Sequence, residues 1–221
     1  MMAHEKTRID QFLLASRVMI ENALQNVDIK QALAAYGYSE EKLNNGKALY
    51  NNAETLQNAQ KKEYGEQVAA TAELDTVWEE AEQQYMKTLK IARVAFKDNV
   101  KANKSTMLYG DRKRSLSGWL EQAKAFYANI LKDTDLMTLI SAYGYTQAKL
   151  EQESDLIDQV FTKHIAQKKE SGEAQEATET RDKALDTLAK WISDLRAVAK
   201  VALESNPQQL EKLGILARSK S

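Results

Sequence analysis

Apolar side chains recur at intervals of three and four residues along most of the chain, a spacing that places them on one face of an α-helix. The pattern is clear over residues 9–27 and again over residues 116–131. A shorter helix is expected to begin at Asp28 and, later in the chain, at Asp135, because Asp is a favourable N-cap residue. The sequence therefore predicts an all-α protein.

Longer amphipathic stretches follow each short helix, at 39–63, 67–98, 146–170 and 174–205. Polar runs containing Gly65 and Gly172 separate the members of each pair. Lys before the glycine and Glu after it are typical of an αα-hairpin, which we expect at both places. The alternative is a single helix of about 60 residues through Gly65, since the heptad spacing of its apolar and aromatic positions does not break.

The chain repeats itself with an offset of 107 residues, the distance from Tyr36 to Tyr143. Apolar character matches at this offset even where identity fails, as in Phe12 and Trp119. Identity extends to four further segments: Lys42-Leu43 with Lys149-Leu150, Gln60–Glu63 with Gln167–Glu170, Gly65-Glu66 with Gly172-Glu173, and Val94-Ala95 with Val201-Ala202. The sequence therefore predicts a tandem duplication of one fold.

We expect residues 1–107 to form one helical bundle (repeat 1) and residues 108–221 to form a second (repeat 2), related by a pseudo-two-fold axis. Each would hold a first helix, a short helix and a long αα-hairpin. Repeat 2 would add a short C-terminal helix, because Asn206 and Pro207 form a start signal and Gly214 a stop signal. Whether the repeats share one core is left open.

The segment YGYS at 36–39 recurs as YGYT at 143–146, and it predicts a corner between two helices. Gly37 would end the short helix in a left-handed conformation, Ser39 would cap the next helix, and Tyr38 would pack against both. The predicted corner residues are Leu33, Gly37, Tyr38, Ser39 and Leu43 in repeat 1 and Ile140, Gly144, Tyr145, Thr146 and Leu150 in repeat 2. The alternative is a ligand-binding box.

Composition narrows the possible chemistry of the 221-residue chain. It has no cysteine, which excludes disulfides, thiolate catalysis and Cys-ligated metals. A net charge of −1 gives no global field for nucleic acid or an anionic membrane. No stretch approaches a membrane span in apolar length. We therefore expect a soluble, cytoplasmic protein that does not bind membranes.

Catalytic and metal-binding patterns are missing from the sequence. Neither His4 nor His164 has Glu three residues before it, as a di-iron bundle requires, and His164 falls on an apolar stripe. No phosphate-binding loop, dinucleotide fingerprint, nucleophile elbow or His-Glu-x-x-His motif occurs. We expect no enzyme activity, no cofactor and no metal, and we interpret the aromatic residues as core.

Basic residues gather in the junction between the repeats, residues 97–114. This segment is expected to be a linker. Its candidate contacts to nucleic acid or to a partner are Lys101, Lys104, Arg112, Lys113 and Arg114. Several basic side chains near Tyr109 could contact phosphates, and the ring of Tyr109 could stack on a base. The alternative interpretation of this segment is a solvated linker.

The leading hypothesis is a non-enzymatic interaction or scaffold module with an unknown protein partner, because the chain is duplicated and lacks catalytic motifs. A nucleic-acid-binding bundle that uses the basic junction is the alternative. The weakest hypothesis is a carrier that holds a small apolar ligand between helices near Trp78 and Trp191.

Overall fold

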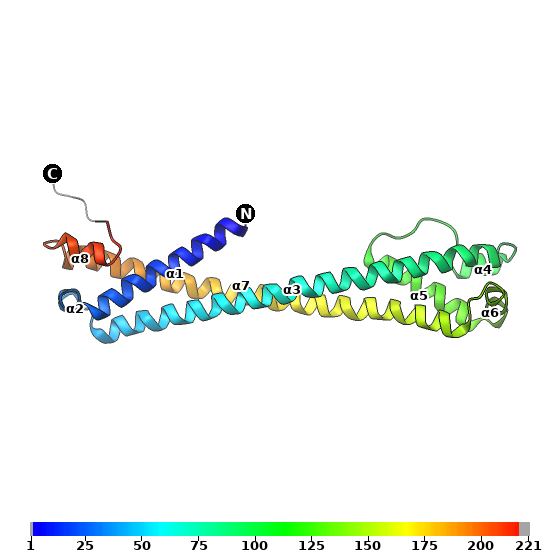
Figure 1. The fold of residues 1–221 in the computed structure, drawn as a ribbon, viewed down its shortest axis with the longest axis horizontal. Helices are drawn as coiled ribbons and strands as arrows, with labels where there is room; N and C mark the ends of the chain where they lie inside the picture. The colour runs from blue at the N-terminus through cyan, green and yellow to red at the C-terminus, as the bar shows by residue number, and fades with distance from the viewer. Residues whose placement is uncertain (1, 217–221) are drawn as a thin grey trace. The chain divides into compact units, whose positions relative to one another are not determined.

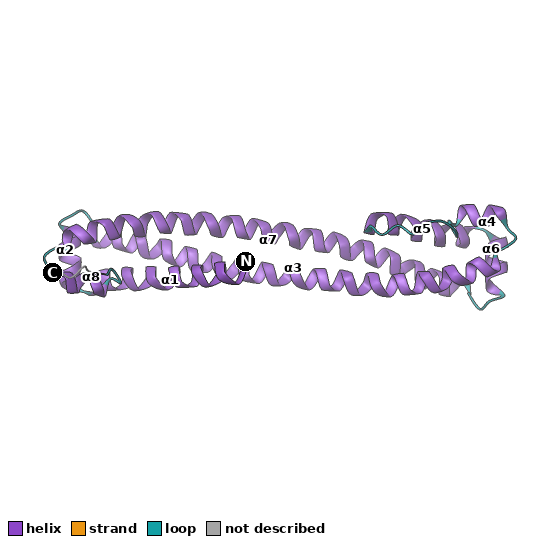
Figure 2. Cartoon of the chain, turned by 90° about the horizontal axis from the view of Figure 1, so that it is seen from above, coloured by secondary structure: helices purple, strands orange, loops and turns teal. Residues whose placement is uncertain are grey.

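The computed structural model describes the backbone of residues 2–216 and the side chains of residues 8–216. This part of the chain is all-helical and contains no strand (Figures 1 and 2). No helix in it is long and apolar enough to cross a bilayer. The side chain of His4 lies outside the described residues. The helices are α1 (Met2–Gln25), α2 (Val27–Ala34), α3 (Glu40–Ala95), α4 (Val100–Ser105), α5 (Leu116–Lys132), α6 (Thr134–Ser141), α7 (Gln147–Ala202) and α8 (Pro207–Lys212).

The two expected αα-hairpins are wrong, because α3 and α7 are single helices of 56 residues each. Gly65 and Gly172 lie inside them, and neither has the positive φ of a helix-ending glycine. A helical glycine costs only about 1 kcal/mol relative to Ala, and the flanking Lys, Glu, Gln and Ala are good helix formers. The unbroken heptad spacing therefore indicated the structure better than the glycine did.

The helices of the two repeats have matching bounds. Adding 107 to both ends of α2, α3 and α4 gives both ends of α6, α7 and α8, and the end of α1 corresponds in the same way to the end of α5. Repeat 2 therefore carries the same order of helices as repeat 1 at the same spacing.

The chain divides into two compact units that do not coincide with the repeats. Unit 1 comprises residues 1–64 and 173–221, and unit 2 comprises residues 65–172. Each unit therefore combines one half of α3 with one half of α7. Unit 1 adds α1, α2 and α8, whereas unit 2 adds α4, α5 and α6.

Each unit has its own hydrophobic core. The core of unit 1 includes Ile20 from α1, Leu43 from α3 and Leu195 from α7. The core of unit 2 includes Phe126 from α5 and Leu89 from α3. Each fully buried side chain of this size contributes about 1.5–3 kcal/mol, so the cores hold the halves of the long helices together within each unit.

The caps of the short helices differ from the expectation by two residues. Asn26, not Asp28, caps α2 by accepting a hydrogen bond from the backbone N–H of Ile29. Asp133, not Asp135, caps α6. An N-cap oxygen must reach N–H groups two or three residues ahead, and Asp28 already lies inside the first turn.

The junction at 97–114 is not wholly a linker, because it contains α4. Asn99 starts this helix, and its side-chain oxygen accepts a hydrogen bond from the backbone N–H of Ala102 at 2.9 Å. The segment after α4, residues 106–115, is irregular, and we call it the strap.

The YGY corners have closely similar geometry in the two repeats. Gly37 and Gly144 have φ of +79° and +80°, in the left-handed region. In repeat 1 the backbone N–H of Tyr38 donates to the carbonyl of Leu33 at 3.1 Å, the bond that defines a Schellman ending; in repeat 2 the backbone N–H of Gly144 donates to the carbonyl of Ser141 at 3.0 Å. The Oγ atoms of Ser39 and Thr146 accept bonds from the backbone N–H groups of Lys42 and Lys149, both at 3.3 Å. The apolar corner residues Leu33, Tyr38, Leu43, Ile140, Tyr145 and Leu150 are buried.

Alanine substitution tests whether α3 and α7 are continuous. A Cβ added at Gly65 or Gly172 meets no atom within 4 Å, so Gly65→Ala and Gly172→Ala should each raise the free energy of unfolding. We expect about 1 kcal/mol for each in urea denaturation. Gly37→Ala is the matched control, because its added Cβ is equally unobstructed but its φ is +79°. It should lower stability by about 1–2 kcal/mol, and destabilisation by all three would contradict continuous helices.

Candidate functional site

Aromatic side chains form one contiguous cluster in the core of unit 2. Tyr85 of α3 lies 6.3 Å from the ring of Trp119 and 5.3 Å from that of Phe126, both edge-on. Trp78, two turns before Tyr85, lies 5.8 Å from Trp119. Tyr127 completes the cluster, 5.1 Å from Phe126. Such tilted and edge-to-face pairs add about 0.5–1.5 kcal/mol each beyond the burial of area, so the cluster stabilises this part of the core.

Arg112 anchors the strap to this cluster. Its Nη1 donates to the hydroxyl of Tyr85 at 2.9 Å, and its Nη2 donates to the carbonyl of Met107 at 2.7 Å. The same Nη2 also reaches the carbonyls of Tyr109 and Gly110, at 3.2 and 3.3 Å. The guanidinium of Arg112 therefore donates hydrogen bonds to three carbonyls of the strap and links the strap to Tyr85 of α3.

Gln122 of α5 holds the next part of the strap. This side chain is 7% exposed; its Oε1 accepts from the backbone N–H of Lys113 at 2.9 Å and its Nε2 donates to the carbonyl of Asp111 at 3.2 Å. Gly118 permits this close approach, because a Cβ there would lie 2.8 Å from the Cβ of Lys113. The backbone of residues 111–113 is thereby fixed against the start of α5.

A cavity of about 860 Å³ lies between the strap and the aromatic cluster. Its apolar wall consists of Trp78, Met86 and Trp119. Every residue of its lining belongs to unit 2. Its volume lies within the range of about 300–1,000 Å³ that is usual for sites of small organic molecules, whereas its lining is more polar than that of most such sites.

Charged residues of both signs make up the polar lining. The strap supplies four of them, and Glu82 of α3 supplies the fifth. The four strap residues are Asp111, Arg112, Lys113 and Arg114. Three cations and two carboxylates give the lining a net charge of +1.

Three N–H groups on cavity-lining residues are buried and make no hydrogen bond: Nε1 of Trp78, Nε1 of Trp119 and Nε of Arg112. Trp119 is only 3% exposed, so solvent does not reach it freely. A buried donor without an acceptor costs about 1–3 kcal/mol. All three unpartnered groups are donors that protein atoms cover, whereas the lining of the cavity offers acceptors in Glu82 and Asp111.

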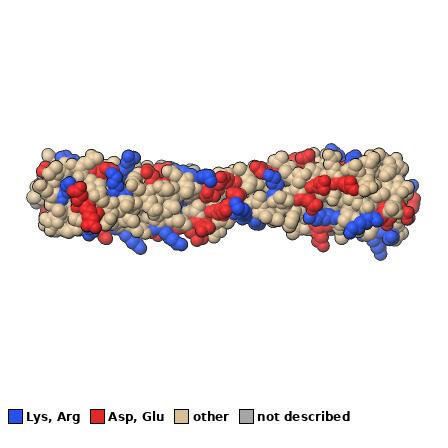
Figure 3. All heavy atoms as spheres, turned by 90° about the horizontal axis from the view of Figure 1, so that it is seen from below, with Lys and Arg blue, Asp and Glu red and all other residues tan. Residues whose placement is uncertain are grey.

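The structure separates the five basic residues that the sequence singled out. Arg112, Lys113 and Arg114 line the cavity, and Arg112 is turned inward. Lys101 and Lys104 belong to α4 and do not line the cavity. On the face drawn in Figure 3, basic and acidic side chains are interspersed.

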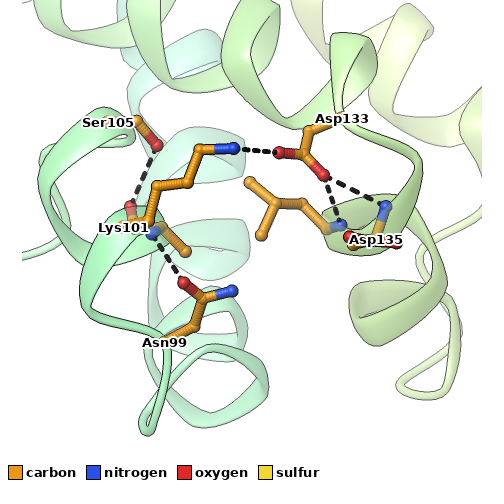
Figure 4. A network of polar contacts seen from close by, with 7 residues as sticks. Asn99, Lys101, Ser105, Asp133 and Asp135 are labelled. Atoms are coloured by element: carbon orange, nitrogen blue, oxygen red, sulfur yellow. Dashed lines mark hydrogen bonds and ion pairs between the residues drawn. The ribbon is translucent and has the colours of Figure 1, made fainter.

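Lys101 has a local structural contact (Figure 4). Its Nζ lies 3.4 Å from Oδ2 of Asp133, whose Oδ1 caps α6 by accepting from the backbone N–H groups of Asp135 and Leu136. The bond from Leu136 and the charge of Lys101 lower the pKa of Asp133 below its ordinary value. Lys101 therefore ties α4 to the start of α6.

Trp191 belongs to unit 1 and Trp78 to unit 2, so these two residues do not line one site. The indole of Trp191 lies against Gly46, where an added Cβ would collide with the ring. It also contacts the ring of Tyr38 edge-on, at 5.9 Å between centroids. Trp191 therefore packs a corner of unit 1.

The sequence interpretation missed a buried polar cluster in unit 2. Oε2 of Glu153 accepts from Oγ1 of Thr88 at 2.6 Å and from the hydroxyl of Tyr127 at 3.1 Å. Glu153 is 6% exposed. Aligning the repeats could have revealed this cluster. At the positions of Thr88, Tyr127 and Glu153, the other repeat has Leu195, Ile20 and Gly46. Three polar residues in place of apolar or small ones indicate a local difference between the units.

Comparisons with protein-family models, with curated proteins and with solved structures gave no match to this chain. Its function must therefore be argued from its own residues. Among the residues that the structure describes, the cavity beside Trp78 and Trp119 combines aromatic and apolar side chains with charged groups of both signs. It is the candidate site.

The cluster around Glu153 predicts an alkaline loss of stability. Burial, and then the charge of Glu153, raise the pKa of Tyr127 far above its ordinary value of 10.0. Its contribution to the free energy of unfolding is complete below about pH 10 and is lost as the pH rises towards the folded-state pKa, by about 1.4 kcal/mol per pH unit. Urea denaturation at about pH 9 and 11 should show a smaller pH-dependent loss for Tyr127→Phe than for the unchanged protein.

Tyr36→Phe is the control for this measurement, because Tyr36 is 54% exposed. It should retain the alkaline loss of the unchanged protein. Tyr127→Phe also removes a hydrogen bond at every pH, so the difference between the two pH values carries the test. An equal loss in all three proteins would contradict the assignment.

Proposed function

We propose that the chain is a non-enzymatic binding protein that takes a small organic molecule with a flat apolar body in the cavity of unit 2. The observation that supports this most is the cavity of about 860 Å³, which Trp78, Met86 and Trp119 line on its apolar side. Trp78 is partly exposed and offers indole area for stacking, whereas Trp119 is 3% exposed and contributes little of its own surface. The edge-on contact of Trp119 with Tyr85 holds this side of the cavity in place without a ligand.

The sequence suggested a small apolar ligand near Trp78 and Trp191. The present proposal keeps Trp78, replaces Trp191 by Trp119, and adds the charged groups of the cavity lining. A protein-interaction or scaffold role, the leading hypothesis from the sequence, remains a proposal, and it does not conflict with ligand binding. The nucleic-acid alternative is less favoured, because the guanidinium of Arg112 is used by Tyr85 and the strap. Lys101 is also paired, with Asp133.

We also infer that repeats 1 and 2 are copies of one ancestral unit. The identities at an offset of 107 residues support this, as do the matching bounds of α2–α4 and α6–α8. Since each compact unit takes one half from each repeat, a single repeat supplies only part of each core. A pseudo-two-fold relation between the repeats remains a prediction.

Separate chains test this inference. Residues 1–107 and 108–221, made apart and then mixed, should form a 1:1 complex, detected by size-exclusion chromatography with light scattering. Self-pairing should be weaker, because Trp191 packs on Gly46 whereas repeat 2 places Glu153 at that position. Two stably folded monomers that ignore each other would contradict the sharing of halves.

Indole N–H resonances test the proposed function. The chain has three tryptophans, so a ¹H–¹⁵N spectrum should show three indole signals. We would titrate the full chain with 2-naphthoate, 2-naphthylmethanol and 2-naphthylmethylammonium. At least one probe should shift the signals of Trp78 and Trp119 in a saturable way, because both line the cavity.

Trp191 is the internal control, since it belongs to the other unit and its signal should not move. Trp→Phe variants assign the three signals. Equal shifts at all three tryptophans would indicate non-specific binding. No shift with any probe up to millimolar concentration would rule out the proposed site.

A further inference from the structure

We propose that two copies of this chain assemble by exchanging repeats, so that repeat 1 of one chain pairs with repeat 2 of the other. The strap is the hinge of this exchange. It joins α4 of repeat 1 to α5 of repeat 2, and a chain without cysteine has no second covalent link between them. The partner is therefore a second copy of the chain itself. This inference goes beyond the proposed function and does not depend on a ligand in the cavity.

The contacts that hold each compact unit together are contacts between the two repeats. Both hydrophobic cores contain residues of repeat 1 and of repeat 2. In unit 1, the ring of Trp191 from repeat 2 lies against Gly46 of repeat 1. In unit 2, Glu153 of repeat 2 accepts a hydrogen bond from Oγ1 of Thr88 of repeat 1 at 2.6 Å. The same contacts form when the two repeats belong to different chains, so the exchanged pair differs from the single chain only in the strap.

The strap is long enough to open. Nδ2 of Asn129 in α5 donates to the carbonyl of Ser105, the last residue of α4, at 2.6 Å. Leu116 begins α5 thirteen residues before Asn129, so the closed strap covers about 20 Å along that helix. The ten residues 106–115 span up to about 33–36 Å when fully extended. The closed strap takes up the excess in a turn, which exchange between chains would pull out.

Backbone strain in the turn opposes the closed strap. Met107 has a φ of +51° and is the only residue other than glycine with a positive φ in the part of the chain that the structure describes. Repeat 2 has Gly214 at the equivalent position, with a φ of +70°. A residue with a Cβ is strained in this left-handed region, whereas glycine is not. Opening of the strap frees Met107 to leave this conformation.

Arg112 favours the closed strap. Its Nη2 donates to the carbonyls of Met107, Tyr109 and Gly110, and pulling out the turn separates the guanidinium from these groups. A short flexible linker holds two modules at an effective concentration of the order of millimolar, so single chains should predominate in dilute solution. The bonds of Arg112 raise this concentration and the strain at Met107 lowers it. These two residues therefore set the balance between single chains and exchanged dimers.

A complementary pair of variants tests the exchange in full-length chains. Gly46→Leu places a side chain where the ring of Trp191 lies, because the three atoms nearest to a Cβ at this position all belong to that ring. Trp191→Ala leaves a hole at the same place. Each variant is destabilised as a single chain. Exchange joins the larger side chain with the hole in one pair of repeats and joins Gly46 with Trp191 in the other, so both pairs fit.

The two variants are unfolded in urea, mixed in equal amounts and refolded together, and native mass spectrometry identifies the products. We expect a dimer that contains one chain of each variant, in at least about tenfold excess over dimers of like chains. Its melting temperature should exceed that of either variant alone. The double variant Gly46→Leu/Trp191→Ala is the matched control, because one chain then carries both changes and fits without exchange. It should remain a single chain under the same conditions.

Variants of the strap test what controls the exchange. Arg112→Gln removes three carbonyl bonds from the closed strap, and each dimer opens two straps. It should therefore raise the dimer association constant at least about tenfold, measured by light scattering over a concentration series. Arg114→Gln is the control, because it removes the same charge from the strap without removing those bonds. Met107→Gly should lower the constant, because glycine adopts the closed conformation without strain.

The outcomes separate exchange from association through a surface. Exchange is wrong if the mixture of Gly46→Leu and Trp191→Ala contains only single chains, or if dimers of like chains are as abundant as the mixed dimer. It is also wrong if the double variant dimerises as strongly as the mixture. If the mixed dimer forms but Arg112→Gln behaves like Arg114→Gln, the second copy is the partner and the role of Arg112 is wrong.

Discussion

The sharing of α3 and α7 between the two compact units is the constraint on which the rest of the structure depends. Neither repeat can bury its apolar face within its own residues, because the first half of each long helix packs in one unit and the second half in the other. A break at Gly65 or Gly172 would uncouple these halves. The strong helix formers around both glycines therefore matter to the cores although the glycines themselves pack against nothing.

The two cores use equivalent positions of the repeats but fill some of them with different side chains. In unit 1, Gly46 leaves room that the indole of Trp191 fills. In unit 2, the corresponding residues are Glu153 and Gln84, and the carboxylate is satisfied by two hydroxyl donors instead. The aromatic walls differ as well: Trp78 and Trp119 correspond to Leu185 and Phe12, which carry no side-chain N–H group. The two indoles that line the cavity are therefore specific to unit 2.

Local sequence signals predicted local structure well. The all-helical class, the first amphipathic helices and the C-terminal helix after Asn206 all follow from spacing and from start signals. The caps at Asn26 and Asp133 were missed because Asp28 and Asp135 are equally good cap residues, and only the length of the preceding helix decides between them. Two plausible oxygens two residues apart cannot be separated by residue type alone.

The candidate site was harder to predict because it depends on contacts between residues far apart in sequence. The basic residues at 112–114 were recognised, but their grouping with Trp78 and Glu82 requires the strap to pack on the second half of α3. Charge counting treated Arg112 as a surface cation, whereas four acceptors surround its terminal nitrogens. Counting basic residues along the chain does not reveal which of them already donate their hydrogen bonds to other parts of the fold.

The hydrogen bonds of Arg112 also order the strap that lines the site. The strap is irregular backbone, and such a segment would cost much conformational entropy if binding alone had to fix it. Here Arg112 binds the strap to Tyr85, and Gln122 binds residues 111 and 113 to α5, before any ligand is present. The charged lining is thereby placed beside the indoles by the fold. A molecule that enters the cavity then meets a strap whose backbone is already ordered.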